Sequence, residues 1–361
     1  MLELRNIGKR VGGQWHLKDI SLRLEKGTLN VLLGPTLAGK TSLMRIMAGL
    51  DQPTEGQVFT NGQDVTGVFV RKRNVAMVYQ QFINYPAMTV YENIASPLRM
   101  AGADKATIDA EVHKVAALLK LEPYLKRKPL NLSGGQQQRT ALARAIVKKA
   151  ELVLLDEPLA NLDYKLREEL REELPRIFAE SGAIFVYATT EPSEALLLAG
   201  NTATLSEGRV TQFGPTVEVF RHPVDLMTAK TFSDPPMNVI SAHKQGDRFQ
   251  IAGAQAALPL PPTAAALPDG TYTLGFRAHH LALAPQNAQC LALTARVAVT
   301  EITGSESFVH LHSQEDRWVL LAHGIHDLEP EQEIAVYLDT RHIIVFDAQG
   351  RTMAGGETHG A

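Results

Sequence analysis

One glycine-rich stretch constrains the fold more than any other: Gly34-Pro35-Thr36-Leu37-Ala38-Gly39-Lys40-Thr41. It matches G-x-x-x-x-G-K-[ST], a phosphate-binding loop that needs a strand before it and a helix after it. The apolar run at 29–33 predicts that strand, and the apolar spacing between 41 and 50 predicts the helix. In such a loop the backbone amides surround the phosphates, Lys40 reaches the β- and γ-phosphates, and the Thr41 hydroxyl binds Mg²⁺.

A second glycine-rich stretch follows later in the chain: Leu132-Ser133-Gly134-Gly135-Gln136-Gln137-Gln138-Arg139. Ser133 is a typical helix N-cap, and the two glycines leave their backbone N–H groups uncovered. A helix terminus of this kind favours a bound anion, because its free amides and the helix dipole both attract negative charge. Taken alone, the stretch is equally consistent with a plain glycine-rich cap.

Two adjacent carboxylates, Asp156 and Glu157, end the apolar run at 152–155. Four apolar residues in a row are typical of a strand that is buried on both faces of a parallel sheet. Ligands of open α/β sheets bind at the carboxyl ends of the strands. We therefore expect Asp156 on the Mg²⁺ side of a nucleotide and Glu157 as the general base that polarises the attacking water. The alternative is a solvated acidic turn.

Composition excludes several classes of protein. The formal net charge of −3 gives no electrostatic case for binding nucleic acid. The single cysteine, Cys290, excludes a disulfide within the chain and fits a reducing compartment; we interpret it as a small hydrophobic residue. No apolar run approaches the length of a membrane helix, and the first residues alternate like a strand and do not resemble a signal peptide. We expect a cytoplasmic protein.

Together and in this order, the three motifs resemble those of the nucleotide-binding subunit of an ATP-binding-cassette (ABC) transporter, over the whole chain. The resemblance implies a chain that binds ATP with Mg²⁺ and hydrolyses it as half of a head-to-tail dimer. In such a dimer the signature contacts the γ-phosphate of the ATP held by the neighbouring subunit. The expected signature residues are Leu132, Ser133, Gly134, Gly135 and Gln136. The expected loop around this chain's own ATP is Gly34, Pro35, Thr36, Leu37, Ala38, Gly39, Lys40, Thr41 and Ser42.

The resemblance also implies roles for residues outside these motifs. Gln80 lies in a Tyr-Gln pair that is similar to the family's Q-loop, so it is expected to contact Mg²⁺ and the attacking water. The Mg²⁺ ligands would then be Thr41, Gln80 and Asp156. The segment 85–94 is expected near the surface that contacts the membrane partner. Asn161 and Asp163 are similar to the D-loop, which crosses the dimer interface.

Two positions depart from the family pattern. Thr190 stands where the switch loop usually has a catalytic histidine, and a threonine hydroxyl is shorter than imidazole and carries no positive charge. The residue expected to stack on adenine is Val11, which is not aromatic; Trp15 either substitutes for it or is a partly buried strand residue. Both departures concern this chain's own ATP site. We therefore predict an unequal pair, in which this subunit hydrolyses its own ATP weakly and a different subunit is fully active. The competing interpretation is that Thr190 is tolerated.

The expected architecture is an α/β P-loop nucleoside triphosphatase (NTPase) with a helical insert, followed by an all-β domain. We predict a nucleotide-binding domain over 1–235 with a helical subdomain at 87–150, a β-barrel domain over 236–353 and a tail at 354–361. The charged run 165–176 predicts a solvated helix face. Beyond 268, short alternating runs predict strands. These expected strands are 272–276, 291–299, 307–312, 318–321, 333–338 and 342–346. The resemblance implies that they form a regulatory domain of oligonucleotide-binding-like barrels.

The resemblance favours the ATPase subunit of a bacterial importer for a sugar or polyol, at the cytoplasmic face of the membrane. A Thr-Thr-Glu-Pro segment at 189–192 resembles one of the paired ATPases of glycerol importers. The implied partners are a second ATPase subunit, two membrane permease subunits and, indirectly, a solute-binding protein. Other interpretations remain open: a polyamine or oxyanion importer, a cassette ATPase acting on DNA or ribosomes, and a β-domain that binds a regulator. The histidines at 279, 280, 310 and 312 lack the cysteine and carboxylate neighbours of a metal site.

Overall fold

The computed structural model describes residues 1–81, 83–160, 162, 164–251, 258–259, 264–313 and 316–355. It consists of two compact units, Met1–Thr216 and Val217–Ala361. The predicted boundary after residue 235 therefore falls inside the second unit, and as a boundary between functional domains it stays a prediction.

The first unit opens with an antiparallel sheet of order β2-β1-β4-β5. Its strands are β1 (Leu2–Val11), β2 (Gln14–Leu24), β4 (Glu55–Thr60) and β5 (Gln63–Asp64). A two-glycine turn joins β1 to β2, and both Gly12 and Gly13 have positive φ. Alternate residues of β2, including Leu22 and Leu24, face the core, as expected of a sheet with one buried side.

A second, mostly parallel sheet of order β10-β9-β3-β8-β7-β6 forms the centre of this unit. Its strands are β3 (Leu29–Leu33), β6 (Val75–Val78), β7 (Leu152–Asp156), β8 (Ile184–Thr189), β9 (Asn201–Ser206) and β10 (Arg209–Pro215). All residues of β7 and β8 are buried, which explains their continuous apolar runs. Because β3 and β7 both pair with β8 in parallel, the carboxyl ends of these three strands lie at the same end of the sheet.

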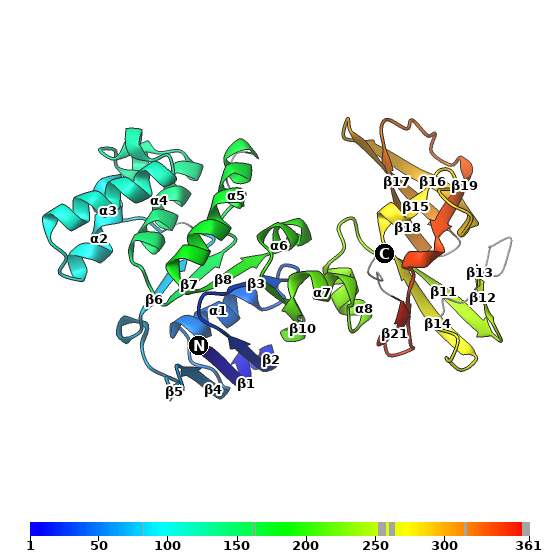
Figure 1. Ribbon diagram of the computed structural model, residues 1–361, viewed down its shortest axis with the longest axis horizontal. Helices are drawn as coiled ribbons and strands as arrows, with labels where there is room; N and C mark the ends of the chain where they lie inside the picture. The colour runs from blue at the N-terminus through cyan, green and yellow to red at the C-terminus, as the bar shows by residue number, and fades with distance from the viewer. Residues whose placement is uncertain are drawn as a thin grey trace. The chain divides into compact units, whose positions relative to one another are not determined.

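Helices cover both faces of the parallel sheet. The helices of this unit are α1 (Lys40–Ala48), α2 (Val90–Met100), α3 (Lys105–Leu118), α4 (Gly134–Val147), α5 (Tyr164–Ser181) and α6 (Pro192–Leu198). Three short 3-10 turns are η1 (Val70–Lys72), η2 (Glu122–Tyr124) and η3 (Pro129–Asn131). Leu43 of α1 packs in one core with Leu4 of the antiparallel sheet and Leu154 of the parallel sheet. Figure 1 shows α2, α3 and α4 grouped as the helical insert, within the predicted range 87–150.

The second unit is mainly β structure. Its helices are α7 (Thr216–Arg221), which begins at the last residue of the first unit, and α8 (Leu226–Thr231). One sheet has the order β13-β12-β11-β14-β20-β21 and the other β15-β19-β16-β17-β18. The strands of the first sheet are β11 (Asn238–Gln245), β12 (Arg248–Ile251), β13 (Leu258–Pro259), β14 (Gly270–Phe276), β20 (Ile344–Phe346) and β21 (Thr352–Gly355). Those of the second are β15 (Leu281–Ala282), β16 (Cys290–Ile302), β17 (Glu306–Ser313), β18 (Asp316–His323) and β19 (Glu333–Asp339).

Side chains from both sheets of this unit share one core, with Trp318 on β18 edge-on to Phe276 on β14 at 5.7 Å between ring centroids. Both predicted parts of the fold, the α/β portion with a helical insert and the all-β portion, are confirmed. One predicted strand is shorter than expected. The run 342–346 becomes a strand only at Ile344, because a 3-10 turn, η6 (Thr340–His342), precedes it and the Asp339 carboxylate accepts the Arg341 N–H. A second 3-10 turn, η5 (Ala278–His280), precedes β15.

Candidate functional site

The phosphate loop joins β3 to α1 at the carboxyl edge of the parallel sheet. Two of its glycines have no room for a side chain: a Cβ on Gly34 would lie 2.3 Å from the Leu205 carbonyl oxygen, and one on Gly39 would lie 2.7 Å from a Leu17 methyl group. Gly39 also has φ 105°, in the left-handed region that glycine adopts without strain. The local requirement for glycine is thus set by the strands packed against the loop.

Lys40 is the first residue of α1 and is only 6% exposed. Its ammonium donates hydrogen bonds to the carbonyl oxygens of Gly34 at 2.7 Å and Pro35 at 3.1 Å. Burial lowers the pKa of Lys40, while the nearby carboxylates of Glu157 and Asp156 act to raise it. The loop therefore holds a buried cation beside two carboxyl groups.

Asp156 and Glu157 end β7 next to this cation. The Thr41 hydroxyl donates to Asp156 Oδ2 at 2.8 Å, and Gln80 Nε2 donates to Glu157 Oε2 at 2.7 Å. Burial raises the pKa of both carboxyl groups. For Glu157, the positive charge of Lys40 opposes the rise and the negative charge of Asp156 adds to it. Five predicted residues from three separate segments are thus brought together at the carboxyl ends of the strands.

The glycine-rich signature forms the start of α4. The Ser133 hydroxyl accepts the Gln136 N–H at 3.3 Å, and Gln136 Oε1 accepts the Ser133 N–H at 3.1 Å, which makes a reciprocal capping box. Ser133 and Gly134 are exposed, and the amides of the first residues of a helix have no acceptor within it. The local geometry suits a phosphate that arrives from outside the chain.

Glu194, which bonds to residues beside the switch loop after β8, was not predicted from the sequence. The buried carboxylate of Glu194 accepts hydrogen bonds from Thr189 Oγ1 at 2.6 Å and from the Tyr187 hydroxyl at 3.1 Å, and pairs with Arg171 on α5 at 3.2 Å. Thr190, in contrast, is exposed. The side chain of Arg171 is 12% exposed, so the charged run 165–176 is not solvated throughout as predicted. The sequence signal for the buried Glu194 is a single glutamate in a short helix whose later residues are all apolar.

The two candidates for stacking on adenine differ in exposure. Val11 lies at the β1–β2 turn and is 48% exposed. The Trp15 ring lies against Gly8 and carries the Arg10 guanidinium 4.0 Å from its centroid. A base that stacks on Trp15 would have to share the ring with this cation. Asn161 and Asp163 lie outside the described residues.

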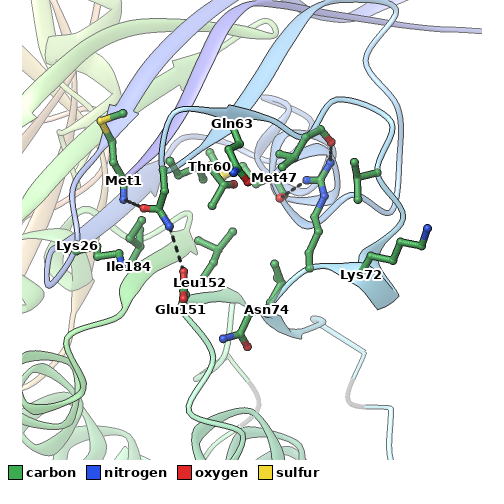
Figure 2. Close-up of a pocket in the computed structure, with 16 residues that line it drawn as sticks. Met1, Lys26, Met47, Thr60, Gln63, Lys72, Asn74, Glu151, Leu152 and Ile184 are labelled. Atoms are coloured by element: carbon green, nitrogen blue, oxygen red, sulfur yellow. Dashed lines mark hydrogen bonds between the residues drawn. The ribbon is translucent and has the colours of Figure 1, made fainter.

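A cavity of about 190 Å³ lies at the amino ends of the parallel strands, away from the phosphate loop (Figure 2). Its lining includes Val75, Leu152 and Ile184, the first residues of β6, β7 and β8. Asp156 is the last residue of β7 and Glu157 follows it, at the other end of the strand, so this cavity is no part of the phosphate-loop site. Within the described ranges, no group of three or more histidine, cysteine or acidic side chains could hold a metal ion, and no helix is long and apolar enough to cross a membrane.

Comparison with known proteins extends these observations. Residues 17–160 match the family model described as ABC transporter. The sn-glycerol-3-phosphate import ATP-binding protein UgpC of Vibrio cholerae is 36% identical over 97% of this chain and 94% of its own length. UgpC of Chromobacterium violaceum is 36% identical over 96% of this chain and 94% of its own. Among solved structures, a dimeric structure of MJ0796, a bacterial ABC transporter cassette, matches with a TM-score of 0.56 and 28% identity, over 60% of this chain and 99% of that one.

Proposed function

The chain belongs to the ABC transporter family and is an ATP-hydrolysing subunit that energises import, and from this premise we propose that it serves the uptake of glycerol 3-phosphate or a closely related glycerol derivative. One observation carries the chemical part of this proposal: the paired contacts Thr41–Asp156 and Gln80–Glu157 beside the buried Lys40. The proposed cargo is that of the relatives, whose sequence similarity to this chain extends over the second unit as well as the first.

The site residues would divide the work of hydrolysis as follows. The loop amides and Lys40 bind the phosphates of ATP, so that the negative charge faces a buried cation in a low-dielectric site. Glu157 orients a water molecule and accepts its proton as the water attacks the γ-phosphate. Gln80, hydrogen-bonded to Glu157, keeps that carboxylate directed at the water. Catalysis thus depends on positioning and charge, without a covalent intermediate.

The donor set also fits Mg²⁺. Thr41 and Asp156 offer adjacent oxygen atoms, and Gln80, whose side-chain nitrogen donates to Glu157, offers a third oxygen on the same amide. Bound there, Mg²⁺ would neutralise charge on the β- and γ-phosphates.

Exposed apolar side chains support a membrane partner. A groove of about 350 Å³ is lined by residues that include Tyr79, Tyr85 and Pro97. Ile83 and Met100, on the same groove, are 60% and 88% exposed. Exposed apolar surface of this kind marks contact sites. We propose that one of the two permease subunits contacts this groove and that the chain lies at the cytoplasmic face of the membrane. A solute-binding protein would act through the permeases, and a second ATPase subunit, different from this chain, would complete the dimer.

Deleting this chain in its native cell should abolish ATP-dependent uptake of labelled glycerol 3-phosphate, glycerol or both, and leave uptake of spermidine and of inorganic oxyanions unchanged. The measurement is initial uptake rate, with a plasmid copy of the chain as the control for restored transport. Purification of the native complex would identify the permeases and the companion ATPase. Unchanged uptake of both glycerol compounds, with loss of another solute, would overturn the proposed cargo and leave the ATPase assignment intact.

The pH dependence of turnover provides a test of the base. Glu157 must be ionised to accept a proton, and burial raises its pKa. As the pH falls, turnover should therefore be lost at a pH above ~4.3, the pKa typical of a free glutamic acid. We expect kcat of the purified chain to fall on the acid side above that value, and residual turnover of Glu157→Gln to lack this limb. An acid limb at or below about 4.3 would contradict the role.

A further inference from the structure

Gln138 is a buried polar side chain with a contact that the functions above do not use. It lies on α4 two residues after the signature and is 2% exposed. Its Nε2 donates a hydrogen bond to the Pro158 carbonyl oxygen at 2.6 Å and lies 3.5 Å from that of Glu157. Its Oε1 is buried and, among the described residues, has no hydrogen-bond partner. The orientation of the amide is therefore set by the turn after β7.

That turn carries Glu157 in an unusual backbone conformation. Glu157 has φ 46°, in the left-handed region that residues with a side chain rarely adopt. Its N–H donates to the Ala188 carbonyl at 3.0 Å, and its carbonyl accepts the Ala160 N–H at 3.3 Å. A conformation of this kind persists only where surrounding contacts fix it. The hydrogen bond from Gln138 to the Pro158 carbonyl oxygen is one such contact, and its donor lies outside the turn, on α4.

We propose that Gln138 is a positioning residue for ATP hydrolysis, which ties the signature helix to the turn that directs Glu157. α4 is one continuous helix from Gly134 to Val147, so the capped terminus at Ser133 and the Gln138 amide move together. A shift of α4 when its signature contacts the neighbour's ATP would therefore reach the general base of this chain's own site. The inference rests on the proposed role of Glu157.

Gln138→Met tests this link, because methionine has a similar length and volume but no N–H donor. In the purified full-length chain we expect kcat to fall roughly tenfold to hundredfold, as for a lost buried hydrogen bond, with KM for ATP changed less than about twofold. The same substitution in a Glu157→Gln background should cause no further loss, because Gln138 acts through Glu157. The matched control is Thr140→Val. It removes a buried hydroxyl that donates to the Gln136 carbonyl oxygen within α4, and it should leave kcat within about twofold.

Amide hydrogen exchange gives a second readout that does not depend on turnover. Exchange of the backbone at 157–160 should accelerate in Gln138→Met and stay unchanged in Thr140→Val. Unchanged exchange, or an additive loss of kcat in the double variant, would overturn the inference. If Glu157→Gln itself leaves turnover intact, the proposed role of Glu157 fails first, and the two failures are distinguished.

Discussion

In the purified chain alone, Lys40→Met should lower ATP turnover roughly 10²–10³-fold, the cost typical of removing one preorganised donor from a phosphate site. The Lys40 ammonium is buried among loop carbonyls beside two carboxyl groups, so solvent cannot replace its charge. Methionine keeps the apolar stem and removes the charge, so the loss reports on phosphate binding and not on packing. Initial hydrolysis rates and equilibrium binding of a fluorescent ATP analogue provide the measurement.

The chain offers a matched control for this substitution. Lys105 is the first residue of α3 as Lys40 is of α1, but it is exposed. Lys105→Met should leave both turnover and nucleotide binding within about twofold, as is usual for an exposed position. Retained ATP binding and turnover in Lys40→Met would contradict the assignment of the phosphate loop.

The contiguous motifs could be predicted from sequence because each one specifies its own local structure. The loop at 34–41 requires the strand before it and the helix after it, and the capping box at Ser133 can be read from residues 133–136 alone. The contacts Thr41–Asp156 and Gln80–Glu157 join residues far apart in the chain. The shared nucleotide roles of Thr41, Asp156 and Glu157 were predicted from their own motifs, because ligands bind at the carboxyl ends of parallel strands. The place of Gln80 beside them followed only from the resemblance.

Two features could not be predicted, for one physical reason. Gln138 bonds to backbone carbonyl oxygens, and Glu194 bonds to hydroxyl groups of β8 and to Arg171 of α5, so the partners of both lie on other elements. Sequence patterns mark polar residues as exposed unless tertiary packing shows otherwise, and here packing buries both. Arg171 could not be predicted as buried for the same reason, because it lies within the charged run 165–176, which is typical of a solvated helix face.

The second large effect concerns Ser133 and follows from the two departures at this chain's own site. Thr190 is exposed and carries no positive charge, and Val11 offers no aromatic ring to a base. This site should therefore hydrolyse ATP slowly, while the signature acts on ATP held by the companion subunit. In the complex, Ser133→Arg should lower turnover about 100-fold, because it blocks the exposed helix terminus, as strong an effect as losing an oxyanion donor.

A conservative variant separates this contact from simple loss of the cap. Ser133→Thr retains a hydroxyl that can accept the Gln136 N–H, so turnover should stay within about threefold of the unchanged complex. Glu157→Gln, which impairs only this chain's own site, should lower turnover of the complex less than about tenfold.

The unequal pair is tested most directly by the steady-state ATPase rate of the purified transporter complex carrying either Ser133→Arg or Glu157→Gln in this chain alone. The account predicts a far lower rate for Ser133→Arg than for Glu157→Gln. A lower rate for Glu157→Gln would contradict it and would give this chain an ordinary role in a symmetric pair.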